Sequence, residues 1–487
     1  MRRQAVLAIT ALLSGCMMGP DYTRPKVDTP PEFRFEPNKV AETANTEWWK
    51  QYNDPALEAL IAEALANNRN VKIAAANVVQ AAGLLTQTRS ALFPQVGYSG
   101  KGERQKIPDT GLVAILPNFP NPQTSYETLL SVSWEIDLWG RVRRLSEAAL
   151  ANVLVSDNAR NGVILSLVAS VASDYIQLRG LDEQLAIAKQ TLGTYAESVR
   201  LFELQFKYGQ ISRMNLAQAQ SQYETAATQI PLIESQIAQM ENALSVLLAR
   251  NPGPIARGKT IDELVMPTVP AGVPSQLLER RPDLMQSEQQ LIAANAQIGA
   301  VKALYFPTIS LTGAFGASSS ELSDLFKGPA RVWSYAGQLT GPIFTFGLIS
   351  GQVTQAEAAQ QSALLNYQQT IQNAFADVDN ALVASQKLSE QLAAQQKLVT
   401  ALKTYSRLAT LQYNGGYAPY STVLQAEQSL FPAELTLANI RASVLASSVN
   451  IYKAMGGGWV TIARNTTAGG AVTESPVDAL QKLPPLF

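Results

Sequence analysis

Residues 126–138 read Tyr-Glu-Thr-Leu-Leu-Ser-Val-Ser-Trp-Glu-Ile-Asp-Leu, and this run sets the fold class. Its polar and apolar residues largely alternate, which is typical of a β-strand with one apolar face and one wet face. The polar face carries Glu127, Glu135 and Asp137, which we expect to line a water-filled interior. The apolar face consists of Tyr126, Thr128, Leu130, Val132, Trp134, Ile136 and Leu138. The run is long enough for a tilted transmembrane strand, which needs ~9–11 residues.

Three further runs fit the same description. A partner strand begins near Phe93, and two more strands follow in the second half of the chain. Their expected outward residues are Ile309, Leu311, Gly313 and Phe315, then Trp333, Tyr335, Leu339 and Ile343. We expect residues 106–125 and 318–330 to be the outward-facing hairpin loops. Four strands cannot close a barrel and hydrocarbon does not tolerate an open sheet edge, so the sequence predicts that several copies complete one barrel.

The two halves of the chain resemble each other. Phe93-Pro94 recurs as Phe306-Pro307, an offset of 213 from residue 93 to residue 306. Asp137-Leu-Trp-Gly140 recurs loosely as Phe344-Thr-Phe-Gly347, an offset of 207 from residue 140 to residue 347. The predicted organisation begins with repeat 1 at 55–250, which holds a helix, a β-hairpin at about 91–139 and a long helical hairpin at 140–250. A linker at 251–280 leads to repeat 2 at 281–456, which holds a helix, a β-hairpin at about 304–346 and a long helical hairpin at 347–456. A tail follows at 457–487.

Two very long helices are expected after the strands. Residues 141 to about 208 and 347 to about 413 contain no proline. At ~1.5 Å per residue, each would extend on the order of 100 Å. Heptad spacing in the two return helices predicts left-handed coiled-coil packing. The heptad positions are Leu216, Ala219, Tyr223, Ala226, Ile230, Ile233, Ile237, Met240, Leu244 and Leu247, then Val423, Ala426, Leu430, Ala433, Leu437, Ile440, Val444, Ser447, Ile451 and Ala454.

The amino end has the layout of an export signal. Arg2 and Arg3 precede the apolar residues 5–13, which are too few to span a bilayer as a helix. Leu13-Ser14-Gly15-Cys16 resembles the bacterial lipobox. The resemblance implies removal of residues 1–15, an S-diacylglycerol and an N-palmitoyl group on Cys16, and a lipid-anchored extended segment at 16–54. The alternative is a plain signal peptide with an incidental cysteine.

Composition argues against several function classes. Only 16% of residues are charged, the net charge is −1, and the chain has no His and one Cys. No charge bias indicates nucleic acid as a partner. The residue types of most transition-metal sites and nucleophilic relays are missing, so we expect no metal site, no cofactor and no enzyme activity.

Several ordered segments together resemble the TolC-like outer-membrane factor family, in particular its lipoprotein branch serving multidrug efflux pumps. The segments are Leu277-Leu-Glu-Arg-Arg-Pro-Asp-Leu284, Ala293-Ala-Asn-Ala-Gln-Ile-Gly299, Ala374-Phe-Ala-Asp-Val-Asp-Asn-Ala-Leu382, Leu424-Gln-Ala-Glu-Gln-Ser-Leu430 and Met455-Gly-Gly-Gly-Trp459. For Arg280, Arg281 and Asp283 we expect a structural role, with Pro282 beginning a helix and Asp283 in its first turn.

The resemblance implies an α+β fold in which three copies form one outer-membrane β-barrel that continues into a long periplasmic α-helical barrel. It implies a passive exit duct for drugs or other small toxic molecules. The implied partners are outer-membrane lipid, a periplasmic adaptor and an inner-membrane transporter of the resistance-nodulation-division type. The alternatives are an exit duct for type I protein secretion and, in another class, a lipid-anchored helical structural or interaction protein.

The same resemblance assigns roles to the turns between the long helices. Gly209, Gln210, Ile211 and Ser212, with Gly415, Gly416, Tyr417 and Ala418, would be the tips where the adaptor docks. They could also be turns only. Relatives often carry acids after the second tip that ring a closed entrance, but Gln425 stands at the matching position here. The candidates for closure are therefore Tyr413, Tyr420, Thr422 and Gln425, and packing between helices is the alternative role for the tyrosines.

Overall fold

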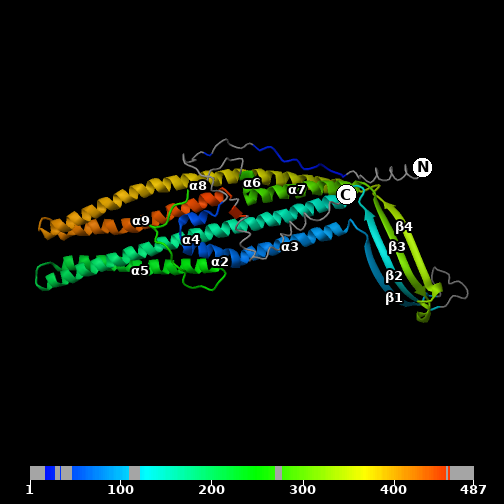
Figure 1. Cartoon of the computed structure of the whole chain (residues 1–487), viewed down its shortest axis with the longest axis horizontal. Coiled ribbons are helices and arrows are strands. Elements are labelled where there is room, and N and C mark those ends of the chain that lie inside the picture. The colour runs from blue at the N-terminus through cyan, green and yellow to red at the C-terminus, as the bar shows by residue number, and fades with distance from the viewer. Residues whose placement is uncertain are drawn as a thin grey trace. The chain divides into compact units, whose positions relative to one another are not determined.

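The computed structural model describes residues 17–27, 33, 46–108, 121–268, 277–456 and 459–460 (Figure 1). Cys16 and most of the expected tail therefore lie outside the described residues. The chain divides into two compact units. The strand unit contains the chain up to Lys26, Val78–Val155 and Ser287–Tyr367, and the helix unit contains the remainder.

The strand unit holds one antiparallel sheet in the order β1-β2-β3-β4. The strands are β1 (Gln95–Gln105), β2 (Gln123–Ile136), β3 (Thr308–Ser319) and β4 (Arg331–Thr340). All four expected strands are thus present. Leu138 and Ile343 lie beyond the ends of β2 and β4, and residues 123–125 and 318–319 belong to strands and not to the expected loops.

The helices account for most of the chain. They are α2 (Pro55–Asn67), α3 (Arg69–Ser90), α4 (Arg141–Lys207), α5 (Arg213–Leu247), α6 (Leu277–Arg280), α7 (Pro282–Lys302), α8 (Leu348–Asn414) and α9 (Tyr420–Ala454). Short 3-10 helices are η1 (Trp48–Tyr52), η3 (Ala303–Tyr305), η4 (Leu322–Asp324) and η5 (Gly328–Ala330). The two long helices α4 and α8 match the proline-free segments.

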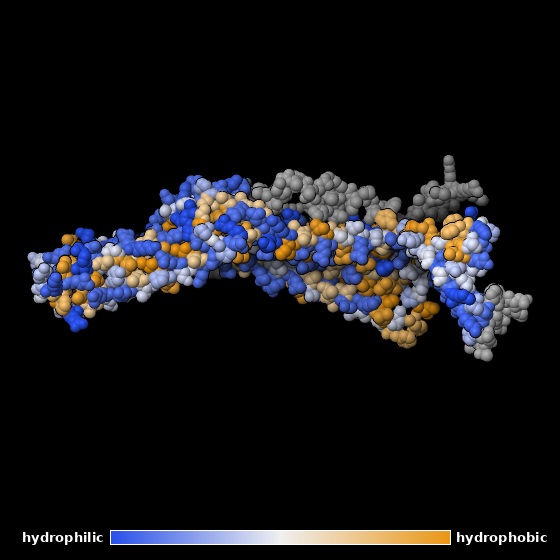
Figure 2. Space-filling model, turned by 90° about the horizontal axis from the view of Figure 1, so that it is seen from below, coloured by the Kyte–Doolittle hydropathy of each residue, from blue (hydrophilic) through white to orange (hydrophobic). Residues whose placement is uncertain are grey.

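The heptad pattern correctly identified the packed sides of α5 and α9. Each heptad position given above is buried or half-buried, while many of the residues between them are exposed. On the face shown in Figure 2, apolar residues lie among polar ones along the helices. This distribution suits helices that pack along a narrow apolar stripe, except at residues 442–452 of α9, most of which are buried.

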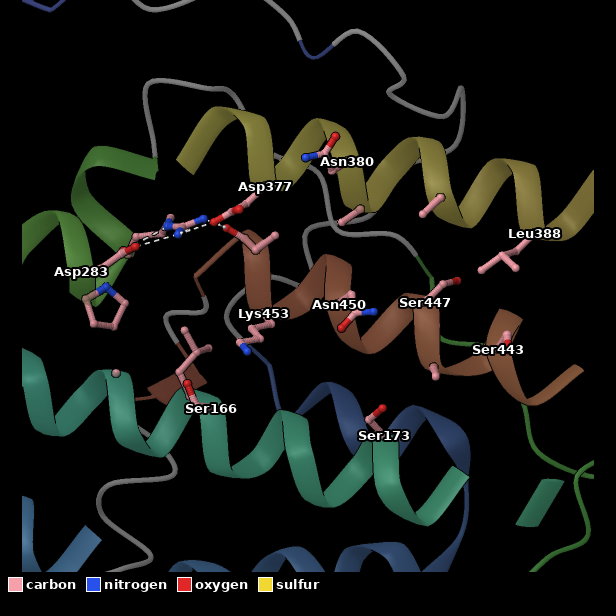
Figure 3. Close-up of a pocket in the computed structure, with 18 of the residues that line it drawn as sticks. Ser166, Ser173, Asp283, Asp377, Asn380, Leu388, Ser443, Ser447, Asn450 and Lys453 are labelled. Atoms are coloured by element: carbon pink, nitrogen blue, oxygen red, sulfur yellow. Dashed lines mark hydrogen bonds and ion pairs between the residues drawn. The ribbon is translucent and has the colours of Figure 1, made fainter. Parts of the chain in front are cut away.

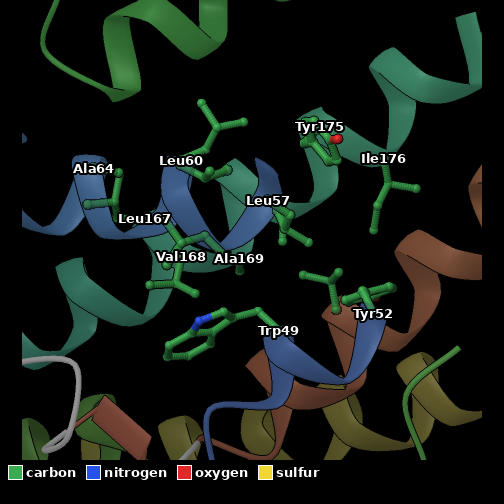
Figure 4. Packing of buried hydrophobic residues seen from close by; sticks show 14 of the residues in the cluster. Trp49, Tyr52, Leu57, Leu60, Ala64, Leu167, Val168, Ala169, Tyr175 and Ile176 are labelled. Atoms are coloured by element: carbon green, nitrogen blue, oxygen red, sulfur yellow. The ribbon is translucent and has the colours of Figure 1, made fainter. Parts of the chain in front are cut away.

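A large apolar cluster forms the core of the helix unit. Trp48 of η1 is fully buried. Figure 4 shows Tyr52 of η1, Leu57 of α2, and Tyr175 and Ile176 of α4, which are also fully buried in this cluster. The Tyr52 hydroxyl donates to the carbonyl of Leu445 in α9 at 2.9 Å. Residues 48–52 therefore form a helical turn with buried aromatic side chains. The expectation of an extended segment throughout 16–54 is wrong at these residues. Burying two Trp rings and one Tyr ring is more favourable in free energy than leaving them exposed to water.

Asp54 fixes this helical turn to the rest of the unit. Its carboxylate accepts hydrogen bonds from the backbone N–H of Ala56 at 2.8 Å, which caps α2, and from the hydroxyl of Tyr175 at 2.8 Å. It also accepts from the backbone N–H of Lys259 at 3.1 Å. These three donors satisfy a carboxylate that is fully buried, so the residues before α2, the helix α4 and the linker are held together at one point.

Candidate functional site

The sheet presents one apolar face across all four strands. In the register of the sheet, Tyr98 lies opposite Leu130, Leu130 opposite Phe315, and Phe315 opposite Trp333. All four of these side chains are exposed, and Tyr98 keeps 92% of its surface accessible. A row of large exposed apolar side chains on one face of a sheet is the arrangement of a strand surface that meets lipid.

The opposite face of the sheet is polar and carries mostly small side chains. It carries Ser131, Ser133, Ser310, Thr312 and Ser334, together with Glu127 opposite Lys101. Lys101 forms an ion pair with Glu103 two residues along β1 at 2.5 Å. Small hydroxyl side chains and a few charges suit a surface in contact with water, as expected for Glu127.

Glu135 and Asp137 are engaged with the start of α4. Both carboxylate oxygens of Glu135 accept from the Arg141 guanidinium, at 2.9 and 3.0 Å. Asp137 lies beyond β2, and its oxygens accept from the backbone N–H groups of Val142 at 3.0 Å and Arg143 at 2.9 Å. The expectation that Asp137 lines the interior is wrong, because its carboxylate satisfies the free N–H groups and positive end of a helix.

The turn between α4 and α5 is the first predicted tip. Gly209 has φ of +71°, and its backbone N–H donates to Phe206 O at 3.0 Å. Ser212 caps α5 because its side-chain oxygen accepts from the N–H of Asn215 at 3.3 Å. Gln210 is exposed and Ile211 half-buried. Large apolar side chains stand exposed around this turn, namely Phe206, Tyr208 and Met214.

The turn between α8 and α9 is the second predicted tip. Gly416 has φ of +74°, and its N–H donates to Tyr413 O at 2.9 Å. Gly415 lies against the ring of Tyr417, because a Cβ there would approach Tyr417 Cδ2 to 2.9 Å. The Tyr417 side chain is 89% exposed, while Ala418 is half-buried. Each tip therefore exposes aromatic surface on a tight glycine turn, as a docking surface would.

The aromatic candidates for closure pack against each other within the chain. The ring of Tyr420 meets that of Phe202 at 4.2 Å and 89°, and Tyr413 lies 5.4 Å from Tyr420. Tyr420 is buried and Tyr413 half-buried. Of the other candidates, Thr422 is half-buried and Gln425 exposed. The packing role considered for the tyrosines is thus present, and a role of any of the four in closure stays a prediction.

One buried arginine joins two of the sequence segments quoted above to the residue that precedes a third, Ala454. Arg281 donates to both oxygens of Asp283, at 3.0 and 2.6 Å, and to Asp377 of α8 at 3.0 Å. It also donates to the carbonyl of Ala454 at the end of α9, at 2.9 Å. We call these four residues the Arg281 cluster, of which Figure 3 labels Asp283 and Asp377. Pro282 begins α7 and Asp283 lies in its first turn, as predicted.

A cavity of about 700 Å³ lies beside the Arg281 cluster. Figure 3 shows its lining by Ser166 and Ser173 of α4, Asn380 of α8, and Asn450 and Lys453 of α9. Its lining mixes apolar side chains with polar ones and includes the charged groups of Arg281, Asp283, Asp377 and Lys453. In the described part of the chain, no group of three or more acidic or sulfur ligands could hold a metal ion.

The residues after Cys16 are fixed to the strand unit. Arg144 of α4 has a buried side chain that donates to Met18 O at 3.1 Å and to Asp21 at 2.7 Å. The N–H of Met18 donates to Trp139 O at 3.2 Å. Further along, Glu288 of α7 accepts from the Tyr22 hydroxyl at 3.0 Å. Met18 and Asp21 therefore lie at the junction of β2 and α4.

Comparison with known proteins agrees with this geometry. The family profile described as outer membrane efflux protein matches residues 60–250 and 273–457. The efflux pump outer membrane protein TtgC of Pseudomonas putida, named as probable, is 37% identical over 466 residues, covering 93% of this chain and 95% of TtgC. The cation efflux system protein CusC of Escherichia coli K12 is 34% identical over 456 residues, covering 92% and 98%.

A solved structure shares the fold. The open state of the MtrE outer membrane channel of Neisseria gonorrhoeae superposes with a TM-score of 0.82 at 32% identity, covering 91% of this chain and 99% of MtrE. The family profile spans most of the chain, and the relatives match over nearly their whole length. The chain belongs to the outer membrane efflux protein family and is an outer-membrane efflux channel protein.

Proposed function

We propose that three copies of this chain form the exit duct of a tripartite pump that removes drugs or other small toxic molecules. The proposal of a trimer is supported by the open sheet, because its outer strands β1 and β4 each have one unpaired edge in the described chain. A sheet with a lipid-facing side needs every backbone group paired, so its edges must meet those of other copies. Three copies would supply twelve strands, four from each.

The helices give the duct its periplasmic part. α4 and α8 are each 67 residues long, which at ~1.5 Å per residue is on the order of 100 Å. Such a length suits a tunnel reaching from the outer membrane towards an inner-membrane transporter. The exposed aromatic side chains at the two tips support docking of a periplasmic adaptor there, since amphipathic aromatic side chains are enriched at protein interfaces.

Cys16 would anchor the chain in lipid. Met17 lies against Gly140, and the contacts of Arg144 fix residues 18–21 beside the start of α4. An acylated Cys16 would therefore emerge close to the membrane-facing sheet. Several acyl chains give durable anchoring. Mass analysis of the mature amino terminus tests this proposal, and an unmodified Cys16 there would refute it.

The function is tested in a strain that lacks this chain. We expect the loss of the chain to raise drug susceptibility and dye accumulation, and the restored wild-type copy to reverse both. A complemented loss of protein secretion with unchanged drug export would instead identify a secretion duct. Purified chain that forms neither trimers nor conducting channels in planar bilayers would refute the duct and favour a structural or interaction protein.

A further inference from the structure

Another cavity of the helix unit lies between α4, α8 and α9. Its volume is about 440 Å³, which falls within the ~300–1,000 Å³ of small-molecule sites. The charged side chains that line it are three carboxylates, Glu183 of α4 with Glu427 and Glu434 of α9, and two cations, Lys403 of α8 and Arg441 of α9. The cavity therefore carries more negative than positive side chains.

Both cations of this cavity already have partners. Lys403 Nζ lies 2.9 Å from a carboxylate oxygen of Glu434. A guanidinium nitrogen of Arg441 lies 2.7 Å from a carboxylate oxygen of Asp262 in the linker. Among the residues that the structure describes, no ion pair engages Glu183 or Glu427. The cavity is thus left with two carboxylates that lack a positive partner.

Glu427 is the more confined of these two carboxylates. One of its oxygens is buried and has no hydrogen-bond partner in the described chain. Burial raises the pKa of Glu427 to about 7, and no neighbouring cation opposes this rise. A buried carboxylate without a partner is unfavourable in free energy. A cation bound in the cavity would supply the missing partner.

Two aromatic rings form the wall beside Glu427. Tyr195 of α4 is 5% exposed and Phe431 of α9 is 7% exposed, and both belong to one buried apolar cluster. Phe431 follows Glu427 by four residues and so lies on the same side of α9. Burial raises the pKa of the Tyr195 hydroxyl, and the charges of Glu427 and Glu434 raise it further, so these carboxylates lie near the Tyr195 ring.

We propose that this cavity binds an organic ammonium ion, a small molecule with one positive charge and an aromatic or alkyl body. The Glu427 carboxylate pairs with the positive charge, while the rings of Tyr195 and Phe431 contact the body. Aromatic rings attract a cation through the negative charge on their faces, in addition to packing against apolar groups. This inference rests on the proposed function and deepens it, because it names organic cations as a class of molecule that the duct holds.

The same side chains disfavour other ligands. An anion would meet the unpaired carboxylates of Glu183 and Glu427, while Lys403 and Arg441 are engaged by Glu434 and Asp262. A bare metal ion needs several ligand atoms around it. The described residues contain no group of three or more acidic side chains that could hold one. An organic cation needs only one carboxylate and a surface for its body.

Dye binding to the full chain tests the site. The probe is tetramethylrhodamine methyl ester, a permanent cation, and its fluorescence anisotropy is titrated with the chain in lipid nanodiscs, with empty nanodiscs as the blank. At pH 8, Glu427→Gln should weaken binding by more than about tenfold, because it keeps the size of the side chain and removes its charge. Glu224→Gln removes an exposed carboxylate of α5 outside the cavity and should leave the affinity unchanged. Fluorescein, an anion with the same ring system, should not compete.

The dependence on pH shows whether the carboxylate itself binds the cation. A carboxyl with a pKa of about 7 is about one-tenth ionised at pH 6 and about nine-tenths ionised at pH 8. The affinity of the wild type should therefore rise about tenfold between these values, and Glu427→Gln should lose this rise. Tyr195→Leu should weaken binding several-fold more than Tyr195→Phe, which keeps the ring.

The outcomes separate this inference from the proposed function. Equal affinities of the wild type and Glu427→Gln refute the site, and so does a wild-type affinity that is independent of pH. Trimers that conduct in planar bilayers but bind no dye above the blank also refute the site and leave the proposed function standing. Dye binding that requires Glu427, by a chain that forms neither trimers nor channels, refutes the proposed function instead.

Discussion

Replacing Arg281 by Ala tests whether the Arg281 cluster holds the ends of α7 and α9 together. The substitution leaves the buried carbonyl of Ala454 without its side-chain donor, which costs about 1–3 kcal/mol. It also removes ion pairs with Asp283 and Asp377, whose side chains are 46% and 54% exposed. Half-exposed pairs contribute at most about 1 kcal/mol each. The total is therefore about 3 kcal/mol.

The assay is hydrogen exchange on the purified trimer, read at the amides of Met285 in α7 and Met455 after α9. These amides donate to the carbonyls of Arg281 and Ile451. When exchange follows local opening, a loss of about 3 kcal/mol makes it about 100-fold faster, since 1.4 kcal/mol is a factor of ten. Asp377→Ala should change the exchange by less than tenfold, because it removes only the half-exposed partner.

Arg280→Ala is the matched control for Arg281→Ala. Arg280 precedes Arg281 and is half-buried, and a substitution outside a bonded network changes stability by about 0.5 kcal/mol or less. Equal exchange in Arg281→Ala and wild type would refute the reasoning. Equal acceleration by Arg280→Ala and Arg281→Ala would show that loss of charge at the helix start, and not the cluster, matters.

Three further variants probe the helix unit and its tips. Burial raises the pKa of Glu427 to about 7 from its ordinary value of 4.5, and one of its oxygens is buried without a hydrogen-bond partner among the described residues. The folded α9 therefore binds this proton more tightly than the unfolded segment does. The protection of residues 420–434 from hydrogen exchange, corrected for intrinsic exchange rates, should be full below about pH 4.5 and should fall as the pH rises through 7. Glu427→Gln should abolish this fall, and a fall that persists in the variant would contradict the assignment. Gly416→Lys should abolish capture of the trimer by its adaptor, because it places a long charged side chain on the proposed docking tip. Trimers should persist, because a Cβ at Gly416 meets no atom within 4 Å and the φ of +74° costs a side chain about 1–2 kcal/mol. Normal capture would mean that the tip is only a turn. Tyr420→Ala should destabilise the start of α9 by about 3 kcal/mol and Tyr420→Phe by much less, since the ring packs on Phe202. If the Tyr420 ring helps to close the entrance, cells with Tyr420→Ala should admit large antibiotics, and normal exclusion would show that it has no part in closure.

The sequence was sufficient for the four strands, for the long helices and for the packed faces of α5 and α9. Alternation in residues 126–138 and the heptads of α5 and α9 are local patterns with the periods of the strand and the coiled-coil helix. The lengths of α4 and α8 followed from the absence of proline. Asp137 was misassigned because alternation continues past the last paired residue of β2, and only the position of α4 shows that its carboxylate caps a helix.

Tertiary structure alone brought distant residues into contact. Arg281, Asp377 and Ala454 lie far apart in the chain, and each appeared in a separate segment of the sequence. Periodicity describes one segment at a time, so it cannot show which helix ends meet. The packing of Tyr420 on Phe202 and the burial of Trp48 were hidden for the same reason, since each contact depends on where other elements fold. Sequence by itself predicted the four strands and the long helices, because backbone hydrogen bonding and apolar periodicity are local. The contacts between these elements were decided by the fold.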